Sequence, residues 1–122
     1  MSDLLLDYET VVEVGIGTRV DLSATLVDAG VSVVATDVVE RSVPDGVTFV
    51  LDDLTDPDVA VYDGAGAIVG RNLPPELQGP MVSVATAVDA DWLFTTLGTD
   101  PALVPADPLT VVDGTVFVPR RN

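Results

Sequence analysis

Short runs of apolar residues recur along the chain and predict β-strands. Valine occupies 24 of the 122 positions, and β-branched residues favour strands. Apolar runs without polar alternation are typical of strands buried on both faces of a parallel sheet. The runs predict five such strands, at Thr10–Val14, Ser32–Thr36, Val47–Val50, Ala67–Val69 and Met81–Ala85.

Helices are predicted between several of these strands. They span Val20–Ala29, residues 56 to about 62, and Ala90–Leu97. Apolar positions at helical spacing support the first, which Gly30 ends. Asp56 and Pro57 suit the N-cap and first position of the second. Asp89 is expected to cap the third, with residues 92–94 as its core.

The end of the chain carries the strongest hairpin signal. Leu109–Val112 and Thr115–Val118 flank the pair Asp113 and Gly114, which is typical of a tight turn between antiparallel strands. Strands that alternate with helices predict a parallel sheet. We therefore expect one small, doubly wound Rossmann-like α/β domain over residues 1–122. Its sheet is mostly parallel, with the first strand inside it and the antiparallel hairpin at the C-terminus.

The balance of charge is strongly acidic. Five basic residues oppose 20 acidic ones, for a net charge of −15; all five are arginine, and sixteen of the acids are aspartate. Such a surface repels nucleic acid and anionic membranes at low salt. Aspartate excess without lysine favours a halophilic archaeal cytoplasm, where salt screens self-repulsion. The N-terminus has no signal-peptide pattern, and no apolar stretch reaches the roughly 20 residues of a membrane helix.

The absence of cysteine and histidine narrows the chemistry. It excludes disulfides, thiolate nucleophiles, serine–histidine machinery and the usual zinc sites. The aspartates between positions 52 and 58 could bind a hard cation, but a solvated acidic surface is the simpler interpretation, and we predict no metal site. No pair of acid and base stands out, so no catalytic residue is assigned.

One motif carries the functional prediction. The first strand ends in Glu13, Gly15 and Gly17, and a helix follows. Glycines at such a turn let a ligand approach the backbone at the helix N-terminus. Asp37 comes twenty positions after Gly17, at the end of the second strand. In this fold an acidic residue at that place accepts hydrogen bonds from the ribose hydroxyls of a ligand. Glu13 lies on a strand buried on both faces and needs a partner, which could be an arginine or a ligand.

Acid-x-Gly-x-Gly at a strand end resembles class I S-adenosylmethionine-dependent methyltransferases. That resemblance implies S-adenosylmethionine as cofactor, with its ribose at Asp37 and its adenine amino group at Asp52 or Asp53. Arg19 stands where the third glycine of that family falls. A dinucleotide fingerprint would instead need glycine at position 20, which is valine.

The segment after the fourth strand partly resembles the Asn-Pro-Pro-aromatic motif of amino methyltransferases. Asn72 matches the asparagine, but Leu73 separates it from the two prolines and Glu76 replaces the aromatic residue. In those enzymes the asparagine holds the target amine. A proline-stiffened loop is the simpler interpretation here.

The combination of EVGIGTR, ATD and LPPELQGP is also similar to uncharacterised protein family 0146, whose members are small archaeal Rossmann-like proteins. The similarity runs from about Val11 to Val118. It implies the fold and leaves the activity open. Three functions remain: an adenosine-nucleotide- or S-adenosylmethionine-binding module, a methyltransferase of unknown substrate, and a dinucleotide-dependent oxidoreductase.

Three of the five arginines follow predicted strands. Arg19 follows the first strand, Arg41 the second and Arg71 the fourth. The carboxyl ends of parallel strands form the ligand crevice of an open α/β sheet. The arginines could therefore bind a carboxylate or phosphate of the ligand. Alternatively, they could pair with neighbouring acids such as Glu13 and Asp37.

Overall fold

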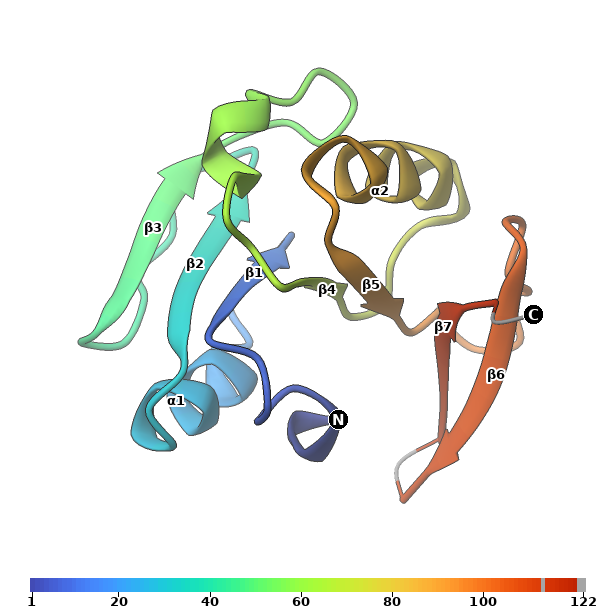
Figure 1. Cartoon of the computed structure of the whole chain (residues 1–122), viewed down its shortest axis with the longest axis horizontal. Coiled ribbons are helices and arrows are strands. Elements are labelled where there is room, and N and C mark those ends of the chain that lie inside the picture. Colours follow the sequence, from blue (N-terminus) through green and yellow to red (C-terminus); the bar gives the residue numbers. More distant parts are fainter. Residues whose placement is uncertain (113, 121–122) are drawn as a thin grey trace.

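Seven strands form one sheet in the computed structural model, which describes residues 1–112 and 114–120. Their order is β3-β2-β1-β4-β5-β7-β6. Strands β1 to β5 are parallel, and β7 lies antiparallel between β5 and β6 (Figure 1). The strands span Thr10–Val14 (β1), Ser32–Asp37 (β2), Val47–Leu51 (β3), Ala67–Gly70 (β4), Asp91–Phe94 (β5), Ala106–Val111 (β6) and Gly114–Pro119 (β7).

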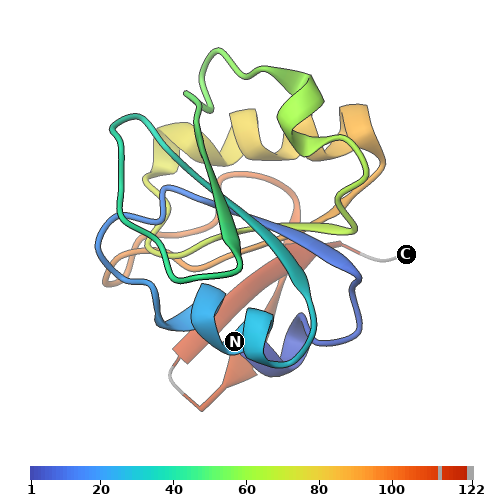
Figure 2. The same cartoon turned by 90° about the vertical axis from the view of Figure 1, so that its left-hand side faces the viewer.

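Helices cover both faces of the sheet. The α-helices are α1 (Asp21–Asp28) and α2 (Pro75–Val88), and the short 3₁₀ helices are η1 (Ser2–Leu4) and η2 (Val59–Tyr62). Figure 2 shows α2 on one side of the strands, with α1 and the N-terminal turn on the other. None of the helices within the described residues is long and apolar enough to cross a bilayer.

Two hydrophobic clusters hold these layers together, one on each face of the sheet. The cluster under α2 includes Ile68, Met81 and Phe94, and the cluster under α1 includes Leu26 and Leu93. Consecutive residues of β1 alternate between them, because side chains of a strand point to opposite faces. Val11 belongs to the α1 cluster, whereas Val12 and Val14 belong to the α2 cluster.

The predicted α/β fold is confirmed. β1 lies inside the sheet, between β2 and β4, and the first four predicted strands are present. The C-terminal hairpin is confirmed by the antiparallel pairing of Val111 with Gly114. Asp113 of the predicted turn lies outside the described residues.

The predicted fifth strand, Met81–Ala85, is wrong, because these residues lie inside α2. Buried Gln78, Met81, Val84 and Ala85 recur at helical spacing. Two features hid that period. Valine and serine alternate here as they would in a strand, and Pro80 lies beyond the first turn, where proline is normally excluded from helices. The segment expected as a proline-stiffened loop is therefore, from Pro75 onward, the start of a helix.

The predicted helix over Ala90–Leu97 is also wrong, because β5 occupies Asp91–Phe94. Trp92, Leu93 and Phe94 are core residues as expected, but they lie in a strand buried on both faces. The predicted helix near residue 60 is the short 3₁₀ helix η2. Its N-cap is Asp58, whose carboxylate accepts a hydrogen bond from Ala60 N, and not Asp56.

Asp89 ends α2 in the left-handed conformation, with φ 59° and ψ 42°, rather than starting a helix. Alanine pays a steric cost there that glycine does not. Both Asp89→Gly and Asp89→Ala remove the same charge from the helix C-terminus. We expect the glycine variant to exceed the alanine variant by about 1 kcal/mol in free energy of unfolding. Urea denaturation in molar KCl measures this difference, and equal stabilities would contradict the left-handed cap.

Candidate ligand-binding site

The turn after β1 places two glycines in a conformation that other residues rarely adopt. Gly15 has φ 60° and Gly17 has φ 58°. A side chain added at Gly15 would meet no other atom within 4 Å, so the turn faces open space. The space is a hollow of about 230 Å³, at the carboxyl ends of β1 and β4. Its lining comprises Glu13, Gly15, Ile16, Gly17, Thr18, Arg19, Arg71 and Asn72.

Asp37 fixes the glycine turn from the neighbouring strand. Its Oδ2 accepts hydrogen bonds from Gly17 N at 2.8 Å and from Arg41 Nε at 3.2 Å, and its Oδ1 accepts one from Val38 N at 2.7 Å. Burial opposes ionisation, but these donors outweigh it and lower the pKa of the Asp37 carboxyl. The predicted spacing therefore brings Asp37 to the turn as an ionised carboxylate, but Asp37 is buried behind Gly17 and is not among the residues that line the hollow.

Glu13 is 1% exposed and points from β1 towards α1. Ser23 Oγ donates a hydrogen bond to its Oε1 at 2.7 Å, and Arg71 Nε lies 3.4 Å from its Oε2. Burial raises the pKa of Glu13, and Ser23 and Arg71 oppose that rise. Of the two partners considered for Glu13, the structure supplies the arginine.

Arg71 joins three parts of the fold. Its Nη1 donates to Asp21 Oδ2 at 3.0 Å, and its Nη2 donates to the backbone oxygen of Arg19 at 2.8 Å. With the contact to Glu13, the guanidinium ties the end of β4 to β1 and to the start of α1. The hydrogen bond from Arg71 lowers the pKa of Asp21.

The three arginines near the strand ends differ in their partners. Arg41 pairs with Asp37, and Arg71 pairs with Glu13 and Asp21, as the structural alternative expected. Arg19 is exposed and makes no ion pair within 4 Å among the described residues. Of these three arginines, Arg19 alone has no direct acidic partner that a ligand would have to displace, although its charge also stabilises the nearby Asp21 carboxylate.

Asp52 and Asp53 lie outside the hollow. Asp52 accepts hydrogen bonds from Tyr62 Oη at 2.6 Å and from Asp58 N at 2.9 Å, which holds η2 against the end of β3. Asp53 Oδ1 accepts hydrogen bonds from the backbone N–H and the hydroxyl of Thr55. No group of three or more acidic residues within the described ranges is placed to hold a metal ion.

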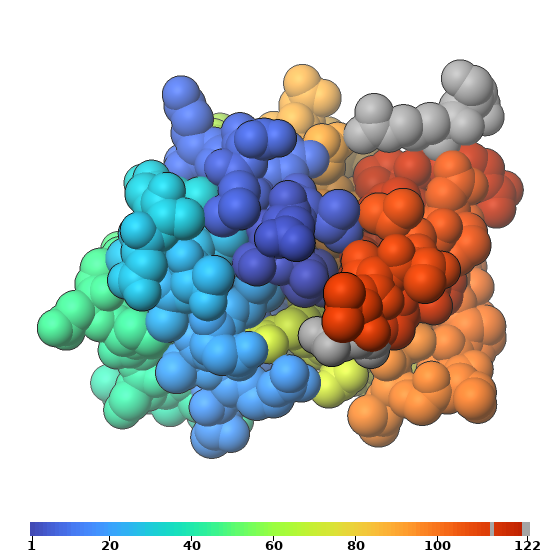
Figure 3. Space-filling model, turned by 90° about the horizontal axis from the view of Figure 1, so that it is seen from below, coloured from blue at the N-terminus to red at the C-terminus, as the bar shows by residue number. Residues whose placement is uncertain are grey.

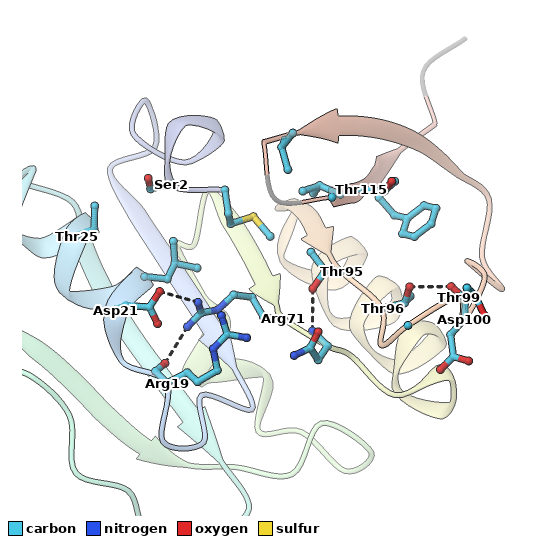
Figure 4. Close-up of a pocket in the computed structure, with 18 residues that line it drawn as sticks. Ser2, Arg19, Asp21, Thr25, Arg71, Thr95, Thr96, Thr99, Asp100 and Thr115 are labelled. Atoms are coloured by element: carbon cyan, nitrogen blue, oxygen red, sulfur yellow. Dashed lines mark hydrogen bonds and ion pairs between the residues drawn. The ribbon is translucent and has the colours of Figure 1, made fainter.

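A larger cleft of about 720 Å³ adjoins the glycine hollow and shares Arg19, Arg71 and Asn72 with it. Figure 3 shows the depression between α1 and the C-terminal hairpin, and Figure 4 shows its two walls. One wall is lined by Arg19, Asp21 and Thr25. The other is lined by Thr95, Thr96, Thr99, Asp100 and Thr115.

The second wall of this cleft was not predicted from the sequence. Thr95 and Thr96 follow β5, and their place at a strand end was hidden because β5 was predicted as helix. Asn72, at the junction of the two hollows, has φ 52°, and its N–H donates to Thr95 Oγ1 at 2.8 Å. Its side-chain amide makes no hydrogen bond among the described residues. Correct placement of β5 would have brought Asn72 and Thr95 together.

Removal of Arg71 should destabilise the fold, because the buried Glu13 carboxylate then loses its ion-pair partner. We expect Arg71→Met to lower the free energy of unfolding by about 3 kcal/mol, because Glu13 keeps only Ser23 as a partner. The matched variant Arg120→Met removes an exposed ion pair with Asp107 and should cost less than about 1 kcal/mol.

The deficit of Arg71→Met should depend on pH. The pKa of Glu13 already lies above its ordinary 4.5 in the folded protein, so the folded state binds that proton more tightly than the unfolded state. The contribution of Glu13 to the free energy of unfolding therefore falls as pH rises from 4.5 through the raised pKa. Loss of Arg71 raises that pKa further. Urea denaturation should show a smaller deficit at about pH 5 than at about pH 8, and an equal deficit would contradict this coupling.

The comparisons with solved structures show the fold. The structure superimposes with TM-score 0.58 and 19% identity on a protein of Rhodobacter sphaeroides assigned as a Zn-dependent alcohol dehydrogenase, covering 81% of this chain and 47% of that one. It superimposes with TM-score 0.51 and 19% identity on the Burkholderia thailandensis 1,6-didemethyltoxoflavin-N1-methyltransferase, covering 90% and 53%. The chain thus spans about half the length of each.

Sequence relatives identify the family. A protein of Halobacterium salinarum is 48% identical over 121 residues, which cover 98% of this chain and 94% of the relative. A protein of Archaeoglobus fulgidus is 45% identical over 84 residues, which cover 69% and 65%. The model of the uncharacterised protein family UPF0146 matches residues 5–122, and the chain belongs to that family.

Proposed function

We propose that the protein is a binding module for an adenosine-containing small molecule, S-adenosylmethionine foremost, held over the Gly15–Gly17 turn. The observation that carries the proposal is the hollow beside this turn, with the Asp37 carboxylate bonded to Gly17 N. The hollow lies where β1 and β4 adjoin and the chain continues to opposite sides of the sheet. Ligands of open α/β sheets bind at this switch point.

The charges near the turn suit the parts of such a ligand. A carboxylate has about four acceptor positions, and Asp37 uses three of them for Gly17, Val38 and Arg41. A ribose hydroxyl can take the remaining position or replace the half-exposed Arg41. The unpaired Arg19 can receive the carboxylate of the amino acid portion.

The topology favours S-adenosylmethionine over a dinucleotide. A dinucleotide-binding sheet has the strand order 3-2-1-4-5-6. Here β7 is inserted antiparallel between β5 and β6, and Val20 stands in place of the third glycine. The Burkholderia methyltransferase of similar fold binds S-adenosylhomocysteine, which supports the same ligand class for this chain.

Asp37→Asn tests the ligand site. Loss of one charged hydrogen bond to the ribose should weaken binding of S-adenosylhomocysteine at least about tenfold. Calorimetry in molar KCl measures the affinity, with NAD and ATP as comparison ligands. Asp28→Asn removes the same charge from the exposed end of α1 and should leave the affinity unchanged. An unchanged affinity in Asp37→Asn, with the fold intact by circular dichroism, overturns the assignment of Asp37.

A second candidate function is methyl transfer from S-adenosylmethionine. The specific observation is Asn72, whose unbonded side-chain amide stands between the glycine hollow and the larger cleft. An amide there can orient an acceptor that takes the methyl group from the sulfonium and releases S-adenosylhomocysteine.

Turnover with the small-molecule fraction of a haloarchaeal extract separates the two functions. A methyltransferase should form S-adenosylhomocysteine. Asn72→Gly should slow that reaction at least about tenfold while the donor affinity is kept, because glycine tolerates φ 52°. Binding of S-adenosylmethionine without product would leave the binding module as the function.

A further inference from the structure

The larger cleft is a distinct space and not an extension of the glycine hollow. It continues along α1 to Thr25 and across to Thr115 of the hairpin, away from Gly15 and Gly17. Its volume of about 720 Å³ is in the range of sites that take a small organic molecule. The N-terminal turn η1 lies between α1 and the hairpin on this face, and Met1 and Ser2 form part of the cleft lining (Figure 3).

The walls of the cleft carry mostly exposed polar side chains that have no hydrogen-bond partner among the described residues. The hydroxyls of Ser2, Thr25, Thr99 and Thr115 line it and make no hydrogen bond within the described part of the chain. The side-chain amide of Asn72 likewise makes no hydrogen bond among these residues. Hydroxyls donate and accept hydrogen bonds, so these walls match a ligand that itself carries several hydroxyls.

The charged residues of the cleft restrict the charge that its ligand can carry. Arg71 is occupied by Glu13 and Asp21, so Arg19 is the available cation at this end. Asp100 lies on the opposite wall, without an ion pair among the described residues (Figure 4). A free cation in a protein of net charge −15 attracts one anionic group, while the surrounding acids repel a polyanion.

We propose that this cleft binds a second small molecule, a polyhydroxylated compound with one anionic group, which Arg19 receives at the border with the glycine hollow. A sugar phosphate and a sugar acid share this chemistry. The threonines and Ser2 bind its hydroxyls, and Asn72 lies against both ligands. Arg19 borders both spaces, so the anionic group of this ligand and the carboxylate of a bound nucleoside would compete for it. The cleft extends beyond the glycine turn, so the second site can be tested with no nucleoside present.

Amide chemical shifts locate the binding. The probes are ribose 5-phosphate, gluconate, uncharged ribose and inorganic phosphate, titrated into ¹⁵N-labelled protein in molar KCl. Ribose 5-phosphate or gluconate should shift the amides of Thr25, Thr95 and Thr115, and the difference between them names the anionic group. Ribose and phosphate should each bind at least about tenfold more weakly, because each lacks half of the interaction.

Matched variants test the two parts of the recognition. Arg19→Gln should lower the affinity for the anionic probe at least about tenfold. Arg120→Gln removes an exposed arginine outside the cleft and should leave that affinity unchanged. Thr115→Val should weaken it several-fold. Thr110→Val changes the exposed partner of Thr115 on β6, outside the cleft, and should have no effect.

The outcomes separate this proposal from the proposed function. Asp37→Asn should lower only the affinity for S-adenosylhomocysteine, and Thr115→Val should lower only the affinity for the anionic probe. No shift in the cleft with either anionic probe overturns the second site, whatever the nucleoside does. Shifts that survive Arg19→Gln unchanged overturn it too, because the anion would then be held elsewhere. Binding of the probe in the cleft without any nucleoside binding supports the second site and overturns only the first.

Discussion

The buried pairing of Glu13 with Arg71 holds together β1, β4 and α1, whose residues and adjoining turns form the glycine hollow and one wall of the larger cleft. A carboxylate inside a core is costly unless it is paired and hydrogen-bonded. Here the ion-pair partner comes from the end of β4, and the hydrogen bond comes from Ser23 on α1. Because Arg71 also engages Asp21 and the backbone of Arg19, the first turn of α1 cannot move away from the sheet edge without breaking several contacts. The position of the glycine turn follows from this arrangement.

The regions predicted well from sequence are those where local signals agree with the tertiary environment. The β1 turn is one example, since its glycines have positive φ and Asp37 reaches Gly17 N across twenty residues. The α2 and β5 region is the opposite case. Pro80 and alternating valines gave a strand pattern to a helix, and Trp92 to Phe94 lack the polar positions that would mark a strand with one exposed face. Burial on both faces erases that period.

The site was predictable only as far as its backbone. The motif located the turn and its acid, but it could not show which arginine remains free. That depends on distances across the sheet: Arg71 reaches Asp21 over fifty positions of sequence. Asp52 illustrates the same limit. Its place after β3 suggested a ligand contact, whereas Tyr62, brought back by η2, occupies its carboxylate.

The bond between Asp37 and Gly17 has a kinetic consequence. The turn is fixed in shape by the chain's own carboxylate and by glycines that tolerate its backbone angles. A ligand that arrives there has little ordering of the loop to complete, so association is not slowed by rearrangement. Differences in affinity among related nucleosides should then arise in how long each one stays bound.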